Sequence, residues 1–593
     1  MPGTGRFPDP GRPPMGMGAA AETALDLPIP PGTEAPTAPP AETGEDGGSG
    51  GGSSLLKSGA MMALGTVASR VTGFLRTAAI VAALGNGALL GIYNTANTFP
   101  NQIYDLLLGG ILTSVIVPLL IRAKERDKAY GEQYEQRVFT LSVIGLGGLS
   151  ALAMLAAPLL ITLSAPSYHG DDRKVAILFA LFFLPQIFFY GIGAFAGAIL
   201  NTRGSFGAPM WAPVLNNVVM IGVGGAFLWV SGGASIGASS ISDTEFYLLA
   251  AGTTGGIVLQ TIALWPSLRR VGFRWRPKLN FQKGEISGVG KLAGWTLLYV
   301  MLTQAAFTVV TALCNSAGTK AHNAGAGDVY GYGSYSTAYM IFQLPYAIVA
   351  VSVITALLPR MSRHATEGAS HLVRDDFSSG LRLSSVIILP AAALMAVLGP
   401  EIAVVLFAHG STSVSDAEVI GRVMQAFAIA LVPFSSYQLM LRVFYAHNDT
   451  RTPAFIAFAT VATNIVCAVG AYYLLPPKWI IIGIASGFAL ANVVGTLVCW
   501  VVLRRKLGGL DGRRVIGTHL KLLVALWPLI GFAYAVHAVI AAALGRGLLP
   551  GMLALIVGSA GGGALYLLFA RLMRVGEIQS MLSMVGSRIP GRG

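Results

Sequence analysis

From residue 55 onward, long apolar segments alternate with short polar or basic ones. A helix needs roughly 20 apolar residues to cross the hydrocarbon core of a bilayer. Fourteen segments reach this length, which predicts an all-α polytopic membrane protein with about 14 transmembrane helices. The predicted spans are residues 55–84, 88–121, 138–164, 174–200, 208–231, 246–267, 287–316, 333–359, 379–399, 417–441, 453–475, 479–503, 516–542 and 549–571.

The composition agrees with a single large membrane domain. Of the 593 residues, 54% are hydrophobic and 11% are charged, whereas soluble domains carry about 25% charged residues. Residues 1–54 differ, because they are rich in Pro, Gly and Ser and have no hydrophobic periodicity. Such a segment cannot bury a core, so we expect a disordered tail.

The basic residues between the predicted spans indicate the orientation. If the N-terminus is cytoplasmic, the loops and C-terminal tail on that side hold 26 Lys and Arg, and the opposite loops hold 5. Cytoplasmic loops of membrane proteins are enriched in Lys and Arg, so both termini are predicted to lie in the cytoplasm. This distribution assigns the net charge of +13 to contact with membrane lipids rather than with nucleic acid.

An internal repeat divides the spans. Tyr93 and Tyr335 open similar segments 242 residues apart, and Pro209 and Pro453 lie in similar loops 244 residues apart. The repeated unit has six helices, an even number, so both copies have the same orientation and predict two lobes related by an axis along the membrane normal. The predicted units are a tail (1–54), an N-terminal six-helix lobe (55–267), a C-terminal six-helix lobe (287–503), two extra helices (516–571) and a second tail (572–593).

Two arginines interrupt the first predicted span, in the stretch "SRVTGFLRTAAI". A charge at the middle of a bilayer costs from about 2.5 to 17 kcal/mol, so Arg70 and Arg76 should face a protein interior or a watered cavity, with Gly73 leaving room between them. Asp105 in the second span lies at a similar depth to Arg70. Two interpretations stay open: Asp105 neutralises Arg70 in a structural pair, or the arginines form an anion site, whose planar guanidinium suits phosphate oxygens.

The second span also supplies three asparagines at near-helical spacing, Asn94, Asn97 and Asn101. They are candidate hydrogen-bond donors to a ligand, and interhelical packing is the alternative interpretation. The chain has no phosphate-binding loop, no metal-ligand cluster and no nucleophile with a base. We therefore expect no catalytic residue, no metal and no cofactor.

Several segments, in order over about residues 55–574, resemble the MurJ (MviN) lipid II flippases. They are "SRVTGFLRTAAIVAALG", "ANTFPNQIYDLLLGGILTSVIVPLL", "AILNTRGSFGAPMWAPVLNNVVMIG", "VITALLPRMSR" and "RVFYAHNDTRTPAF". This family belongs to the multidrug/oligosaccharidyl-lipid/polysaccharide exporter superfamily, and the resemblance implies that the two extra helices (516–571) form a lipid groove. The Ala- and Gly-rich composition and the long tail are typical of an actinobacterial branch.

The resemblance implies that Arg70 and Arg76 line the cavity that receives the lipid II pyrophosphate. It also exposes departures, because residues charged in the best-known members fall on neutral positions here. A cavity aspartate falls on Gly91, an arginine on Tyr104, an acidic–arginine pair on Tyr339 and Met340, and a glutamate on Gln343.

The predicted function is therefore a lipid II flippase of the bacterial inner membrane that works by alternating access. Its expected substrate is an undecaprenyl-pyrophosphate-linked disaccharide peptide, and the N-terminal tail is a candidate contact for cell-wall synthesis or regulatory proteins. Three alternatives remain: a flippase for another lipid-linked polysaccharide, a drug or cation exporter of the same superfamily, and a non-transporting cell-wall scaffold. A cation exporter would need acidic residues in its cavity.

The predicted orientation has a direct test. Single cysteines placed in the loops 122–137, 268–286 and 504–515 should be shielded from a membrane-impermeant thiol reagent in intact cells, because these loops are predicted to be cytoplasmic. Labelling should appear only after the membrane is permeabilised. Ready labelling of any of the three loops in intact cells would contradict the orientation.

Overall fold

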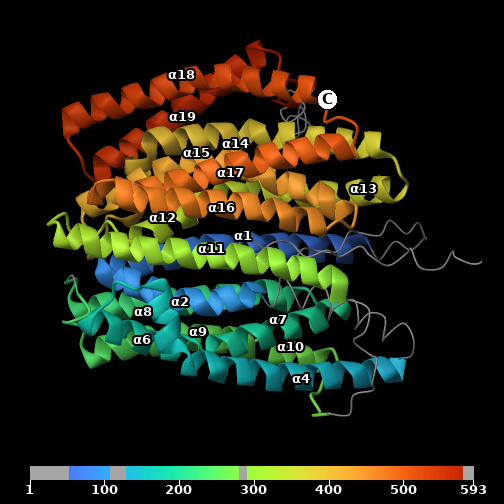
Figure 1. The fold of residues 1–593 in the computed structure, drawn as a ribbon, viewed down its shortest axis with the longest axis vertical. Helices are drawn as coiled ribbons and strands as arrows, with labels where there is room; N and C mark the ends of the chain where they lie inside the picture. The colour runs from blue at the N-terminus through green and yellow to red at the C-terminus, as the bar shows by residue number, and fades with distance from the viewer. Residues whose placement is uncertain (1–51, 107–127, 235, 279–289, 579–593) are drawn as a thin grey trace, which may run out of the picture.

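The computed structural model describes residues 52–106, 128–234, 236–278 and 290–578 of the chain. Within these ranges the chain forms helices and no strand (Figure 1). The elements are α1 (Gly52–Leu84), α2 (Ala88–Leu106), α4 (Lys128–Leu155), α5 (Ala157–Ser164), α6 (Gly170–Phe183), α7 (Gln186–Thr202), α8 (Gly207–Ser231), α9 (Asp243–Ile262), α10 (Trp265–Arg270), α11 (Gly290–Asn323), α12 (Tyr332–Pro345), the π-helical turn η2 (Tyr346–Ala350), α13 (Val351–Thr366), α14 (Ser370–Phe407), α15 (Val414–Ala446), α16 (Arg451–Leu474), the 3-10 turn η3 (Pro477–Trp479), α17 (Ile480–Lys506), α18 (Gly512–Leu544) and α19 (Leu548–Leu572).

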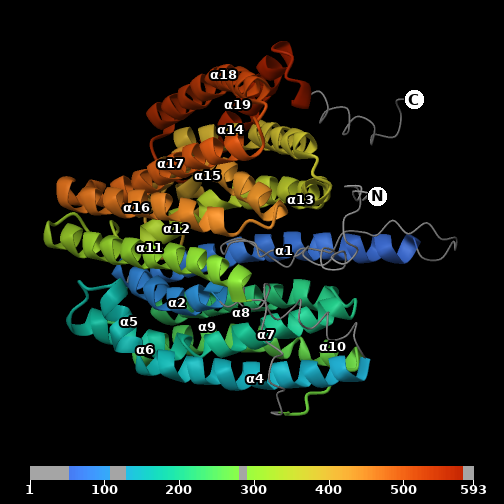
Figure 2. The same cartoon turned by 45° about the vertical axis from the view of Figure 1, so that its right-hand side comes forward.

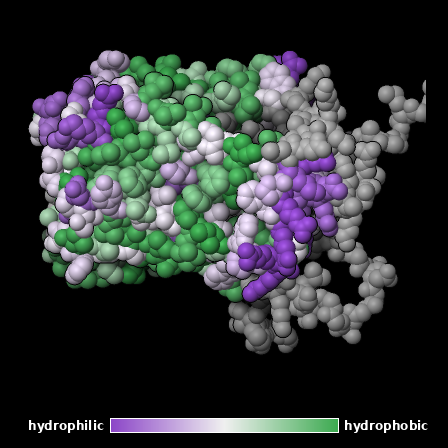
Figure 3. All heavy atoms as spheres, turned by 90° about the horizontal axis from the view of Figure 1, so that it is seen from below, coloured by the Kyte–Doolittle hydropathy of each residue, from purple (hydrophilic) through white to green (hydrophobic). Residues whose placement is uncertain are grey.

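Twelve helical segments of the described chain are long and apolar enough to cross a membrane. They coincide with the third to the fourteenth predicted spans, and α1 and α2 coincide with the first two. The face in Figure 3 carries a broad hydrophobic band between hydrophilic ends, as a bilayer-spanning surface requires. The predicted all-α membrane fold is thus confirmed, while the count of fourteen spans stays a prediction.

The helices of the first half pack in a defined order. α1 packs against α8, α8 against α9, and α9 against both α6 and α7. α4 packs against α7, and α2 packs against α6. In Figures 1 and 2 most of these helices lie together in the lower part of the molecule.

The second half repeats this order six spans later. α11 packs against α16, α16 against α17, and α17 against α15. α14 packs against α15, as α4 packs against α7 in the first half. α12 also packs against α15, as α2 packs against α6. Each equivalent pair is in contact in both halves, so the packing agrees with the predicted parallel repeat of two six-helix units.

The remaining two helices, α18 and α19, form an antiparallel pair at the upper edge of the molecule (Figures 1 and 2). Both pack against α14, and Tyr566 on α19 donates a 2.7 Å hydrogen bond to the backbone oxygen of Val386 on α14. Large apolar side chains on the outer faces stay exposed, such as Trp527 and Val539. These helices therefore extend the bundle on the side of the second six-helix group.

Local sequence signals explain where several helices begin and bend. Ser242 and Ser413 start α9 and α15 through capping boxes, in which the serine hydroxyl and the acidic residue three positions later satisfy each other's backbone N–H groups. α14 bends at Leu398, whose φ and ψ of −102° and 20° are not helical. This residue lies two positions before Pro400, whose ring is incompatible with the preceding helical turn.

The two six-helix groups meet where α1 ends at Leu84 and α2 begins at Ala88, which we call the hairpin end. α2 packs against α12 there, and glycines on both helices allow a close approach. A Cβ atom at Gly333 would lie 3.3 Å from the backbone nitrogen of Gly91. The second and eighth predicted spans, which the predicted repeat makes equivalent, are therefore in contact at the hairpin end.

This contact predicts a specific crosslink. The side chain of Asn94 donates a 3.0 Å hydrogen bond to the Ser336 hydroxyl, so the pair Asn94→Cys and Ser336→Cys should form a disulfide in a background where the three native cysteines are replaced by alanine. In the control pair, Asn94→Cys with Gln343→Cys, the second cysteine lies about 10 Å further along the helix. Equal crosslinking of the two pairs would contradict this arrangement of α2 and α12.

Candidate anion-binding pocket

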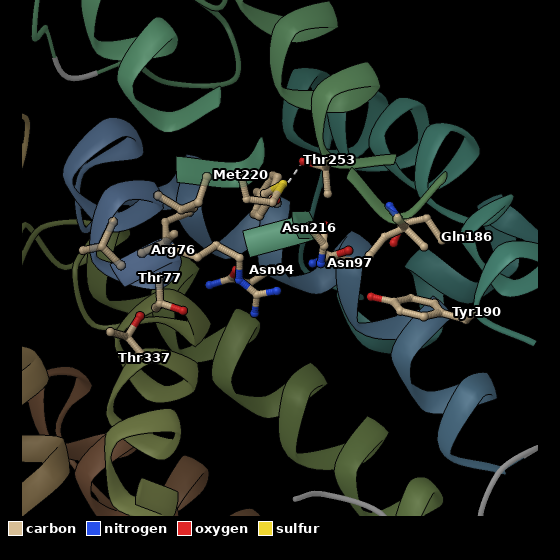
Figure 4. A pocket seen from close by; sticks show the side chains of 15 residues that line it. Arg76, Thr77, Asn94, Asn97, Gln186, Tyr190, Asn216, Met220, Thr253 and Thr337 are labelled. Carbon is tan, nitrogen blue, oxygen red and sulfur yellow. Dashed lines mark hydrogen bonds between the residues drawn. The ribbon is translucent and has the colours of Figure 1, made fainter. Parts of the chain in front are cut away.

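A cavity of about 80 Å³ lies inside the first six-helix group, next to the contact with α12. At about 10–15 Å³ per water, it has room for about six waters. The wall comes from α1, α2, α7, α8 and α9, with one residue from α12 (Figure 4). The lining residues are Arg76, Thr77, Ile80, Val81, Leu90, Tyr93, Asn94, Asn97, Gln186, Tyr190, Asn216, Met220, Thr253, Ile257 and Thr337.

Arg76 is the only charged residue among the described residues that line this cavity. No carboxylate in the described part of the chain lies within ion-pair distance of its guanidinium. Figure 4 shows Arg76 beside Asn94 and Thr77, with Asn97 across the cavity. The pocket thus combines one cation with neutral polar groups, an arrangement that attracts an anion and repels a cation.

The predicted site residues fall into two sets. Arg76, Asn94 and Asn97 line the pocket together. Arg70 and Gly73 do not contribute to the lining. A Cβ atom at Gly73 would lie 3.5 Å from the amide nitrogen of Asn217 on α8, so this glycine faces the packing between α1 and α8.

The remaining two predicted residues lie nearer to the end of the described part of α2. Asn101 is exposed, and its side chain donates a 2.8 Å hydrogen bond to the backbone oxygen of Asn97 instead of lining the pocket. The side chain of Asp105 lies outside the described residues. The pair between Asp105 and Arg70, and the ligand role of Asn101, therefore stay predictions.

Sequence reasoning missed several polar lining residues. Tyr93 is buried and lies 2.9 Å from the Thr253 hydroxyl, which itself donates to the backbone oxygen of Leu249. Since the threonine proton is used there, the tyrosine must donate, and its own oxygen remains an acceptor. Gln186 and Asn216 are also buried lining residues. In the sequence, these residues differ from their neighbours only as polar residues inside predicted spans, and no spacing in the sequence links them to Arg76.

The hairpin end beside the pocket is closed by neutral hydrogen bonds between the two six-helix groups. The Asn86 side chain donates to the Ser334 hydroxyl at 2.8 Å and to the backbone oxygen of Asp416 at 2.9 Å. The Thr412 hydroxyl donates to the backbone oxygen of Val81 at 2.9 Å. These bonds hold the two six-helix groups together at the hairpin end, and none of them is an ion pair.

A buried amide strengthens this closure. Asn315 on α11 donates to the Thr95 hydroxyl at 2.9 Å and to the backbone oxygen of Ser164 at 2.8 Å, and its oxygen accepts from Tyr168 at 2.8 Å. It therefore connects α11, α2, the end of α5 and the segment that follows α5. Both groups of helices contribute to one satisfied polar network, which is costly to disrupt in part.

The sequence of this chain is similar to that of a known protein family. Residues 80–555 match the family model described as "Lipid II flippase MurJ". The chain belongs to the MurJ family. A relative from Rhizobium meliloti (strain 1021), named "Probable lipid II flippase MurJ", is 28% identical over 454 residues, which cover 76% of this chain and 81% of the relative.

Solved structures show the same fold. A structure titled "Lipid II flippase MurJ, inward closed conformation" superposes with a TM-score of 0.67 and 19% identity, and covers 86% of this chain and 98% of that one. A multidrug resistance MATE family transporter in an inward-facing conformation gives a TM-score of 0.54 and 15% identity, covering 76% and 95%. MurJ membership identifies the chain as a transporter and not an enzyme.

Two positions where the MurJ resemblance implies charges have different packing here. Tyr339 belongs to an aromatic cluster, with ring centroids 5.5 Å from Phe427 and 5.7 Å from Phe488. The sulfur of Met340 accepts a 2.9 Å hydrogen bond from the pocket residue Thr77. Aromatic packing and a contact with the pocket wall thus occupy the two positions where the resemblance implies an acidic–arginine pair.

Proposed function

We propose that this chain moves lipid II from the cytoplasmic to the outer leaflet of the bacterial inner membrane, and that Arg76 binds its pyrophosphate. Family membership supports the substrate, since relatives across several bacteria carry the name lipid II flippase. The observation that carries the site is Arg76 itself, the one charged lining residue in the described part of the pocket. No bond is made or broken in this function.

The chemistry of arginine supports a phosphate ligand. The guanidinium is planar, stays charged, and presents paired N–H donors that match two oxygens of a phosphate. Each such charge-assisted hydrogen bond contributes about 1.5–3 kcal/mol. Asn94 and Asn97 from α2 lie on the same cavity and offer further donors to the same oxygens.

The closed hairpin end supports alternating access. In this conformation α1, α2 and the turn between them are hydrogen-bonded to α12, to Asp416 of α15 and to Thr412 just before it, which supports access to the pocket from the opposite side of the bundle. The Lys and Arg bias of the loops predicts that this opposite side faces the cytoplasm. We infer that the described conformation receives the head group from the cytoplasm, and that transport requires the bonds of Asn86 and Thr412 to break.

Other parts of the proposal rest on sequence. They are the inner-membrane location, cytoplasmic termini, the units 55–267, 287–503 and 516–571, and a lipid groove beside the extra helices. Membrane lipids are the expected neighbours of the exposed apolar faces. The tail 1–54, most of which lies outside the described residues, remains a candidate contact for cell-wall synthesis proteins.

One alternative substrate keeps specific support. The neutral residues at Gly91, Tyr339, Met340 and Gln343 leave this chain with fewer charges than the resemblance implies. A different lipid-linked polysaccharide would still present a phosphate to Arg76. A cation exporter is disfavoured, because the pocket has a guanidinium and no carboxylate among its described lining residues.

The role of Arg76 predicts a loss of function that charge alone cannot rescue. Arg76→Lys keeps the charge but loses the paired donors, so lipid II transport should fall about 10- to 100-fold, and Arg76→Ala should fall at least as far. Growth of cells depleted of their own lipid II flippase measures this loss, with membrane protein level followed by immunoblot. As a matched control, Arg422→Lys changes an arginine on α15 that pairs with Glu418 outside the pocket, and should support normal growth. Normal growth with Arg76→Ala at normal protein level would refute the site.

A further inference from the structure

We propose that Gln186 forms a second subsite in the Arg76 pocket, which accepts a hydrogen bond from a sugar hydroxyl or amide N–H next to the bound phosphate. This inference rests on the proposed function and extends it from the phosphate to the group attached to it. Gln186 is fully buried on α7, and its amide oxygen has no hydrogen-bond partner among the described residues.

The orientation of this amide follows from its neighbours. The Thr254 hydroxyl donates a 2.6 Å hydrogen bond to the backbone oxygen of Phe182, so its proton is already used. Toward Gln186, at 3.0 Å, the same hydroxyl can therefore only accept, and the side-chain NH₂ of Gln186 must face it. The amide oxygen is consequently the atom left for the pocket, and the usual ambiguity between the two amide orientations is removed.

The position of Gln186 in the chain explains why this geometry is rigid. Pro185 separates α6 from α7, and Gln186 is the first residue of α7. In Figure 4 its nitrogen points away from Tyr190 and its oxygen lies on the side of Tyr190. A burial this complete leaves the side chain little freedom to find another partner, so the pocket presents a preorganised acceptor.

Other groups on the same wall reinforce this chemistry. The Tyr93 oxygen keeps acceptor capacity, because its proton goes to Thr253. The amide oxygen of Asn97 is buried without a partner in the described part of the chain. The cavity thus has a donor side at Arg76 and an acceptor side at Gln186, which matches a ligand with anionic oxygens at one end and O–H or N–H donors at the other.

The chemistry of the pocket selects among ligand classes. A bare phosphate would satisfy Arg76 and leave the Gln186 oxygen unpartnered. A monovalent cation would satisfy the oxygens but would sit in the same small cavity as the guanidinium. A phosphate that carries a sugar satisfies both sides, and about six waters of space suffice for the phosphate and its nearest donor group but not for a disaccharide.

The test compares two ligands on each variant. Purified full-length protein is titrated with lipid II, which carries sugars, and with undecaprenyl pyrophosphate, which carries none. The readout is the ratio of the two dissociation constants. In Gln186→Met the acceptor is lost at similar side-chain length, so lipid II should bind about 10- to 100-fold more weakly while undecaprenyl pyrophosphate binds as before.

Controls separate this role from folding and from the phosphate site. The ratio cancels any general loss of folded protein, and Thr254→Val, which frees the amide to turn, should lower the lipid II preference by a smaller factor. Gln425→Met, whose amide bonds the backbone oxygen of Ala396 outside the pocket, should leave the ratio unchanged. Arg76→Lys should weaken both ligands, because both carry the pyrophosphate.

An unchanged ratio in both Gln186→Met and Thr254→Val overturns the subsite. If Arg76→Lys still weakens both ligands in that case, the phosphate site stands and only the sugar subsite fails. If Arg76→Lys has no effect on either ligand, the proposed function of Arg76 fails instead. Equal shifts of both ligands with sodium concentration, lost in Gln186→Met, would assign the oxygens to a cation and also overturn the sugar subsite.

Discussion

A guanidinium within a helix that is predicted to span the membrane must be surrounded by polar groups, because exposure to hydrocarbon costs several kcal/mol or more. Arg76 imposes this constraint on the first six-helix group. Five of its helices contribute side chains to the wall around the guanidinium, and the polar ones are neutral apart from Arg76 among the described residues. The polar pocket therefore makes it possible to bury this arginine. Since no carboxylate lines the described part of the pocket, a bound anion can neutralise the guanidinium there.

The hydrogen bonds that close the hairpin end join uncharged groups, which affects how easily this end can open. The contacts that close the hairpin end are hydrogen bonds of amides and hydroxyls, and each contributes about 0.5–1.5 kcal/mol net. A handful of such bonds can be exchanged for bonds to water or ligand more easily than buried ion pairs, whose rupture costs about 3–5 kcal/mol. Close approach of Gly91 and Gly333 supplies packing without charge. The closed end thus suits a protein that must open it repeatedly.

Much of the fold could be predicted from the sequence, because span length, loop charge and internal repetition are properties of the chain itself. Among the described residues, the contacts of α1 with α8, α8 with α9 and α4 with α7 recur as those of α11 with α16, α16 with α17 and α14 with α15, in line with the offset between Tyr93 and Tyr335. The site was only partly predictable. Arg76, Asn94 and Asn97 stood out as polar residues in two consecutive spans, and a hairpin places consecutive spans together.

The other wall of the pocket could not be read from spacing. Gln186 and Thr253 lie more than 100 residues from Arg76, and only the packing of α7 and α9 against the first helices brings them to the same cavity. The separation of Arg70 from the pocket also needed the structure, because rotation of α1 against α8 decides which side of the helix faces inward. Residue types in the sequence indicated which side chains could bind an anion, and tertiary packing determined which of them line the same pocket.

The most direct test of lipid II transport is its appearance in the outer leaflet. Cells depleted of their own lipid II flippase would express this chain, and a membrane-impermeant enzyme that cleaves lipid II would be added from outside. If the chain transports lipid II, outer-leaflet lipid II should return to the level of undepleted cells. Absence of cleavable lipid II, with the chain present in the membrane at normal abundance, would contradict it.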